Sequence, residues 1–135
     1  MMMINSWFRP RFRVEESAVL VGARYGRYWI ARHRRLTTGE YSCVAADATW
    51  AFHREEARGD VVGFFHTHPP RAGTQPSATD RATMQTWVDS FGKPLLCVIQ
   101  CGRATRATLF RAWDDPGVPM RRVVWIDRHT LVAVW

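Results

Sequence analysis

Two histidines two positions apart close an apolar segment of the chain. His66 and His68 stand at the end of residues 60–66, DVVGFFH, which predict a short strand. In an extended strand, side chains at positions i and i+2 project to the same side, so both imidazoles can bind one metal ion. Imidazole nitrogen is a common ligand of divalent metals. The pair therefore predicts part of a metal site.

Asp80 is the candidate for a third ligand. It lies in the first turn of a helix predicted over residues 77–91, where Ser77 and Asp80 fit the S-x-x-D capping box. Two imidazoles and one carboxylate are the ligand count of a catalytic zinc that keeps a fourth position open for water. Surface histidines and a plain helix cap are alternative interpretations of each part alone. The ordered combination favours a metal site.

Other His-x-His enzymes do not fit the chain. A metallo-β-lactamase pattern requires H-x-H-x-D-H, and Pro70 and Arg71 stand where its Asp and last His belong. The H-x-E and P-C-x-x-C motifs of zinc deaminases and the H-E-x-x-H motif of zincins are absent from the sequence. A barrel amidohydrolase would need a much longer chain than 135 residues.

The ordered motifs resemble the JAMM/MPN+ (JAB, Mov34) zinc metalloprotease family, bacterial standalone type. Its pattern is a distant Glu, then H-[ST]-H-P, a loop and S-x-x-D. The chain has HTHP at residues 66–69 and SATD at residues 77–80. The family's Glu opens a strand of the form E-x-x-x-apolar-apolar-x-Gly, which Glu15 and Gly22 match. The resemblance covers roughly residues 14–112.

The resemblance implies a mechanism and a role for each residue. Zinc held by His66, His68 and Asp80 would activate a water, Glu15 would act as general base, and the Ser77 hydroxyl would stabilise the oxyanion.

Glu16 and Glu40 are rival carboxylates for the role of the base. Alternation places Glu15 with Ser17 on one face of the strand and Glu16 with Ala18 on the other. Register alone does not choose between them, and the spacing to Gly22 favours Glu15.

The implied activity is cleavage after the C-terminal tail of a ubiquitin-like protein, in deconjugation or precursor processing. The tail is expected to lie extended beside a strand near the site. Partners implied are the ubiquitin-like protein or its conjugates, with activating and conjugating enzymes from the same operon, in some members in antiviral defence. Two alternatives remain open: a nonenzymatic MPN-type scaffold and a RadC-like protein associated with nucleic acid.

The remaining pattern predicts one domain, residues 1–135, of α+β (mixed α/β) class. A central, mostly antiparallel twisted sheet flanked by helices is expected, and the resemblance implies the cytidine-deaminase-like JAB/MPN architecture. Gly22 is expected to end the first strand, with a turn over 22–26. Strands are predicted at 14–21, 25–33, 40–46, 60–66, 94–100, 104–113, 122–126 and 131–135, and helices at 47–58 and 77–91.

Charge and composition limit partners and location. The net charge is +7, with Lys93 the single lysine among 19 basic residues. An acidic partner is favoured, but the arginines are spread along the chain, so nucleic acid is not expected. Three cysteines without framework spacing indicate reduced thiols, with Cys97 buried. No signal peptide and no membrane-spanning segment is recognised, so a cytoplasmic protein is expected.

Overall fold

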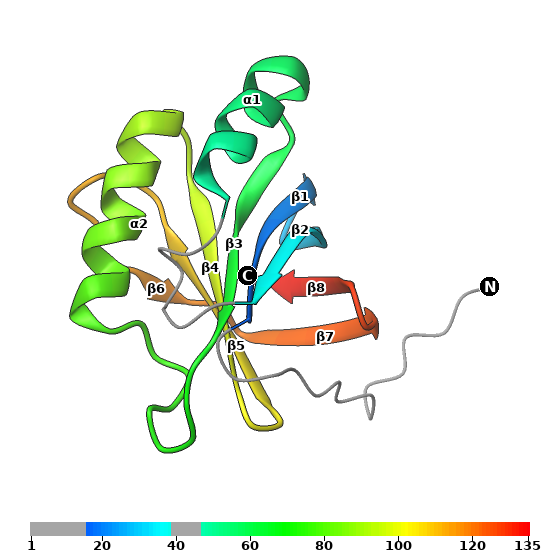
Figure 1. Ribbon diagram of the computed structural model, residues 1–135, viewed down its shortest axis with the longest axis vertical. Coiled ribbons are helices and arrows are strands. Elements are labelled where there is room, and N and C mark those ends of the chain that lie inside the picture. Colours follow the sequence, from blue (N-terminus) through cyan, green and yellow to red (C-terminus); the bar gives the residue numbers. More distant parts are fainter. Residues whose placement is uncertain (1–15, 39–46) are drawn as a thin grey trace.

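The computed structural model describes residues 16–38 and 47–135, which form one sheet and two helices (Figure 1). The elements are β1 (Glu16–Tyr25), β2 (Tyr28–Thr38), α1 (Ala48–Arg58), β3 (Val61–Thr67), α2 (Ala78–Phe91), β4 (Leu95–Cys101), β5 (Ala104–Phe110), β6 (Val118–Pro119), β7 (Arg122–Asp127) and β8 (Thr130–Val134).

The strands follow the order β6-β5-β4-β3-β1-β2-β8-β7 in one sheet. All neighbouring pairs are antiparallel except β3 and β4, which run parallel. This confirms the α+β class and the mostly antiparallel sheet.

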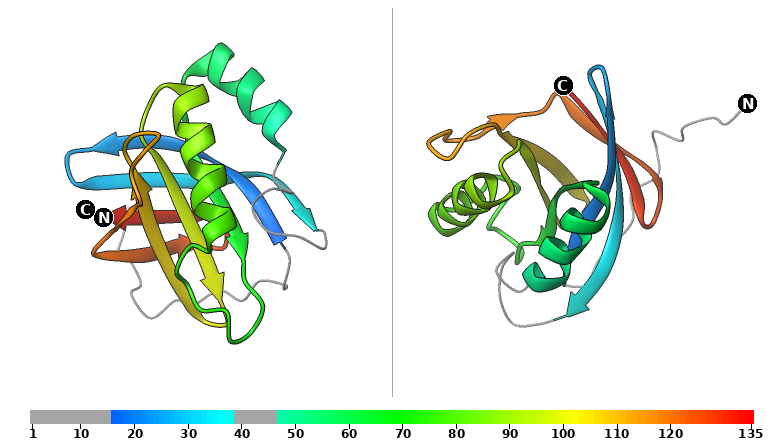
Figure 2. Two further views of the ribbon diagram at one scale, coloured as in Figure 1. Left: turned by 90° about the vertical axis from the view of Figure 1, so that its left-hand side faces the viewer. Right: turned by 90° about the horizontal axis from the view of Figure 1, so that it is seen from above.

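Both helices cover the same face of the sheet (Figure 2). Side chains of α1 and α2, among them Ala51, Met84 and Val88, share one buried cluster with Phe64 of β3 and Ile99 of β4. The helix predicted over residues 77–91 is therefore confirmed, with Ser77 as its N-cap residue. The expectation of helices flanking the sheet is corrected to helices on one side of it.

The opposite face of the sheet encloses a second core to which neither described helix contributes a buried residue. Leu20 of β1, Phe65 of β3, Leu109 of β5 and Trp125 of β7 are buried in it. The sheet curves enough for Trp125 Nε1 to donate a hydrogen bond of 2.9 Å to Thr105 Oγ1 on β5. Curvature thus replaces a second helical layer in covering this face.

Gly22 does not end β1, contrary to the sequence prediction. The strand continues to Tyr25, and the turn is formed by Gly26 and Arg27, with Gly26 at φ 61°. A Cβ atom on Gly22 would overlap the carbonyl oxygen of Ile30 on β2. The glycine therefore permits close approach of two strands and makes no turn.

The C-terminal hairpin packs on the protein's own core. β8 lies between β2 and β7, and Leu131 and Ala133 are buried. The predicted pairing of 122–126 with 131–135 is confirmed, with β7 as the edge strand. β5 ends at Phe110, earlier than predicted, and β6 was not predicted. The strand expected at 40–46 lies outside the described residues.

No helix in the two described ranges combines the length and apolarity needed to cross a membrane.

Candidate metal centre

β3 positions the two histidines at the centre of the sheet. The strand pairs with β1 on one side and β4 on the other. His66 is opposite Ser17 of β1, on the face that the helices cover, and its side chain is 1% exposed. His68 follows the end of the strand, where its backbone N–H donates to Gln100 O at 2.8 Å. The i, i+2 placement predicted from the sequence is confirmed.

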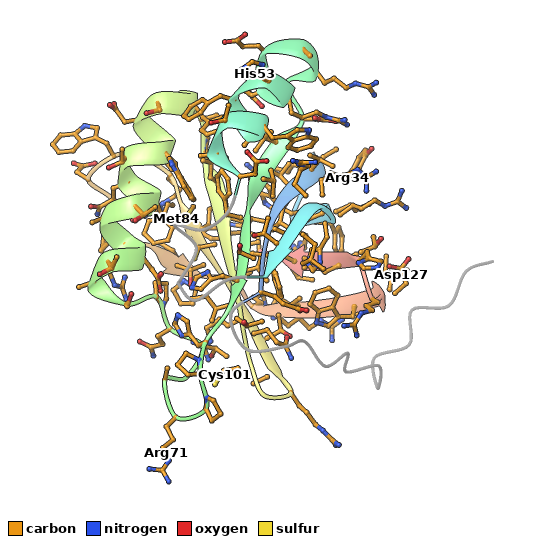
Figure 3. The ribbon with its side chains drawn as sticks, in the orientation of Figure 1. Arg34, His53, Arg71, Met84, Cys101 and Asp127 are labelled. Atoms are coloured by element: carbon orange, nitrogen blue, oxygen red, sulfur yellow. The ribbon has the colours of Figure 1, made fainter. Side chains whose placement is uncertain are left out.

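The first turn of α2 positions Asp80. Ser77 is the N-cap residue, and Ser77 and Asp80 form the predicted capping box. Asp80 is fully buried, and Met84, one turn further along α2, lies toward the sheet (Figure 3). The cap fixes where the helix begins, so it also fixes the carboxylate.

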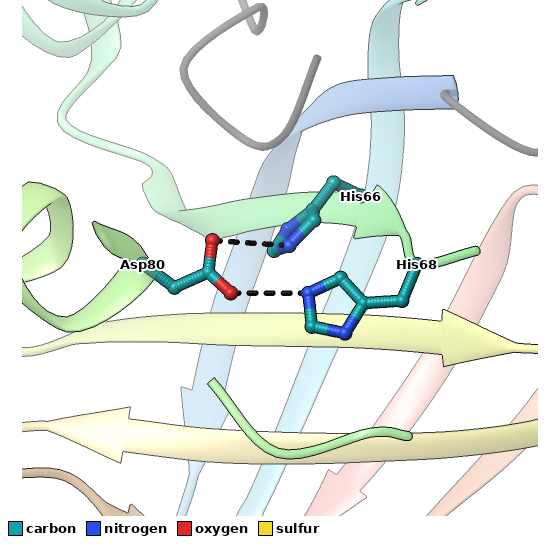
Figure 4. A group of neighbouring side chains, drawn as sticks. All are labelled: His66, His68 and Asp80. Carbon is teal, nitrogen blue, oxygen red and sulfur yellow. Dashed lines mark hydrogen bonds and ion pairs between the residues drawn. The ribbon is translucent and has the colours of Figure 1, made fainter. Parts of the chain in front are cut away.

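The three side chains converge, as Figure 4 shows. His66 Nε2 lies 3.3 Å from Asp80 Oδ1, and His68 Nε2 lies 3.1 Å from Asp80 Oδ2. One ligand atom from each of the three residues lies within 4.8 Å of the others. Residues from a strand end and a helix start, separated by a loop, therefore form one cluster that could hold a metal ion.

The electrostatics favour an ionised carboxylate at the centre of the cluster. Burial tends to raise the pKa of Asp80, but the contacts with His66 and His68 and the backbone N–H of Ser77 outweigh it and hold that pKa well below its usual range. The hydrogen bond to Asp80 raises the pKa of His68 against the opposing effect of burial. A deprotonated carboxylate is the form that binds metal.

The histidine nitrogens fit a metal ligand set. His68 Nδ1 lies 2.8 Å from the carbonyl oxygen of Gly73, which can only accept, so Nε2, which faces Asp80, is the ring nitrogen available to a metal. Among the described residues, the buried ring of His66 has one polar contact, the 3.3 Å approach of Nε2 to Asp80 Oδ1. An imidazole nitrogen that faces a carboxylate in this way is placed to bind a metal ion together with it.

Gly73 is the residue of the metal centre that the sequence analysis missed. It positions His68 through a main-chain carbonyl oxygen, and any residue type could supply that atom. Its φ of 75° is a conformation that favours glycine, so the glycine in the Pro-rich loop was the available signal.

Ser77 caps helix α2, in addition to the role in oxyanion stabilisation predicted for it. Its Oγ accepts a hydrogen bond of 3.0 Å from the backbone N–H of Asp80. The residue is exposed at the start of α2. A hydroxyl that accepts through oxygen still has its own proton to donate, so capping and oxyanion stabilisation are compatible.

Of the three candidate general bases, Glu16 alone lies in the described part of the chain. Glu15 and Glu40 lie outside the described residues. Glu16 opens β1 with its backbone N–H donating to Thr67 Oγ1 at 2.9 Å, and its side chain is buried. Its place in β1 is on the face of Ala18, opposite to the face of Ser17 and His66. Glu16 is therefore on the wrong side of the sheet for this cluster.

Comparison with known proteins gives a family for the chain. No curated protein and no solved structure matches it significantly. A family model described as prokaryotic homologs of the JAB domain matches residues 7–115. The match spans most of the chain and includes His66, His68 and Asp80. The chain therefore belongs to the prokaryotic JAB domain family.

Proposed function

We propose that this protein is a zinc-dependent peptidase that cleaves the peptide or isopeptide bond after the C-terminal tail of a ubiquitin-like protein. The observation that carries the proposal is the convergence of His66, His68 and Asp80 in a buried cluster of a JAB-family domain. A complete three-residue ligand set argues against a scaffold that has no metal. The proposed place of action is the cytoplasm.

The zinc ligands are assigned from the hydrogen bonds around them. His68 would bind through Nε2, because Nδ1 faces the carbonyl of Gly73. His66 would bind through a buried nitrogen and Asp80 through one carboxylate oxygen. Bound zinc supplies Lewis acidity, which lowers the pKa of a water toward neutrality.

Glu15 is proposed as the general base. It would take the proton of the attacking water and return it to the leaving amine. Ser17, two residues along, is opposite His66, and sequence alternation assigns Glu15 to the same face. The Ser77 hydroxyl would donate to the developing oxyanion.

The substrate is proposed to approach from the side of His68. The side chain of His68 is 10% exposed, whereas His66 and Asp80 are closed to solvent. The tail has no access to the edges of β3, since that strand is paired on both sides. We therefore propose that the tail crosses the end of the sheet over loop 68–77, whose tip carries Arg71 away from the body of the protein (Figure 3).

The decisive experiment separates the two adjacent glutamates. A ubiquitin-like protein encoded in the same genome, fused through its C-terminus to a reporter, serves as substrate. Purified wild-type protein should contain about one zinc per chain and cleave the fusion. Glu15→Gln should keep the zinc and lose activity by about a hundredfold or more. Glu16→Gln is the matched control and should keep both.

Three results would contradict the proposal in different ways. Full activity in Glu15→Gln would move the base to another carboxylate, with Glu40→Gln as the next variant. Bound zinc without cleavage in the wild type would favour the scaffold alternative. Absence of zinc from the wild type would remove the metal site itself.

A further inference from the structure

An arginine-lined groove lies at the seam where the curved sheet fails to close. A cavity of about 550 Å³ lies between β5 and β7, one of the two edge strands of the sheet, and the hydrogen bond from Trp125 to Thr105 crosses the same seam. We call it the seam groove. Its lining includes Arg103, Arg106, Met120, Arg121, Arg122 and Trp125.

The seam groove has two incompletely paired strand edges. β6 pairs with β5 at Thr108 and Leu109, and the N–H of Met120 donates to Ala107 O at 2.9 Å. In the described part of the chain, residues 104–106 of β5 have no strand on that side. Among the described strands β7 pairs with β8 alone, and its residues Arg122, Val123 and Trp125 line the same cavity. Edges of this kind can accept an added strand.

The charge of the groove is of one sign. None of the described residues that line it is aspartate or glutamate. The arginines that form ion pairs within the described ranges are Arg35, Arg54 and Arg111, all outside the groove. Four guanidiniums with no carboxylate partner among the described residues make this a positive surface that attracts an anionic one.

A neighbouring cavity extends the positive surface. This cavity of about 430 Å³ shares Arg121 and Arg122 with the seam groove and adds Arg27 and Tyr28. Five arginines of the two cavities thus account for much of the net charge of +7.

We propose that the seam groove binds an extended acidic peptide segment of a partner protein, which adds as a strand between β5 and β7. The strand edges supply main-chain hydrogen bonds and the arginines select acidic side chains. The buried aromatic residue in the lining of the seam groove, Trp125, favours a peptide over single-stranded nucleic acid as the ligand. Trp125 is 1% exposed and cannot stack on a base, which leaves Tyr28 as the aromatic with an exposed face in the two linings.

The groove opens at the same end of the sheet as the metal cluster. Ile99 of β4 pairs with His66 on one side and with Arg106 on the other. Arg106 is thus two strands, about 10 Å, from His66. The proposal does not depend on the metal site, and a His68→Ala variant should bind the peptide unchanged.

The test uses the full chain and a fluorescein-labelled peptide of alternating Glu and Val. The peptide has about eight residues, so that in an extended conformation it is longer than the unpaired edges of β5 and β7. Binding should be saturable and should weaken about tenfold in a double variant of Arg106→Glu and Arg122→Glu. Arg58→Glu, on the exposed end of α1, is the control for charge reversal outside the groove and should bind as the wild type does. Amide resonances of residues 104–106 and 122–125 should shift on binding.

Two peptide controls test charge and strand addition separately. Replacing Glu by Gln should abolish binding, and a central proline should weaken it, because proline cannot donate to a strand. Tighter binding of oligothymidylate than of the acidic peptide, lost in the same double variant, would overturn the proposal in favour of nucleic acid. If neither probe binds, the proposal is also overturned. The arginines would then serve only to prevent edge-to-edge aggregation of the sheet.

Discussion

Ser77 and Asp80 exchange hydrogen bonds with each other's backbone. The N–H of Ser77 donates to Asp80 Oδ2 at 2.9 Å, and the N–H of Asp80 donates to Ser77 Oγ at 3.0 Å. The same Oδ2 lies 3.1 Å from His68 Nε2. The start of helix α2 and the proposed metal ligand are therefore one structural unit, and disturbance of the cap displaces the ligand.

Ser77→Ala should lower both stability and activity. Loss of the cap should cost about 1 kcal/mol in the free energy of unfolding, measured by urea denaturation. Activity at saturating zinc should fall further than the loss of folded protein explains, because the oxyanion loses a donor. Ser77→Thr keeps the hydroxyl and should restore both. Unchanged kcat in Ser77→Ala would restrict Ser77 to capping.

Asp80→Asn should abolish the stabilisation of the protein by zinc. A ligand that binds the folded chain alone stabilises it by about 2.7 kcal/mol at a concentration one hundred times its Kd. The wild-type Tm should therefore rise on addition of zinc to the chelated protein, and that of Asp80→Asn should not. Asn keeps the shape of Asp but removes the charge, so a Tm rise in this variant would contradict the ligand assignment.

The metal cluster was predictable because its signals are local. The i, i+2 histidines depend on strand periodicity and Asp80 on a capping box, and both were found where predicted. Gly22 was misinterpreted because its function is to let Ile30 of the paired strand approach, which one segment alone does not reveal. The exclusion of Glu16 likewise needed the register of β1 against β3, a nonlocal pairing, and Glu15 stays a prediction. The curvature that forms the seam groove has no sequence signature.

Gly63→Ala should destabilise the strand that carries the histidines. A Cβ at this position would overlap the carbonyl oxygen of Leu96 on β4, so β3 would have to move away from its parallel neighbour. We expect a loss of about 2–3 kcal/mol in the free energy of unfolding and weaker zinc binding.

Gly102→Ala is the control for glycine substitution as such. Gly102 has φ 60° and open space around its Cα, so alanine there should cost about 1 kcal/mol from backbone strain and leave zinc affinity unchanged. Equal effects of the two variants on zinc affinity would contradict close packing of β3 and β4 as the cause.

His33 should make the stability of the protein fall in mild acid. Its ring is buried, with its centroid 4.3 Å from that of Phe65 at an interplanar angle of 39°, and it lies edge-on to Trp125. Burial lowers the pKa of His33 to about 3, and the nearby charges of His129 and Arg128 lower it too. In the unfolded chain the pKa returns to about 6.5.

The direction of the pH dependence of stability follows from the difference in proton uptake between the unfolded and folded chains. Below about pH 6.5 the unfolded chain binds a proton at His33 that the folded chain does not, so acid favours unfolding. The free energy of unfolding should fall by up to about 1.4 kcal/mol for each pH unit between about 6.5 and 3, with no contribution from His33 above that window. His33→Phe keeps a ring against Phe65 and should remove this slope. Urea denaturation of both proteins from about pH 7 to about pH 4 measures the difference, and a difference that stays constant with pH would show that His33 is not the titrating group.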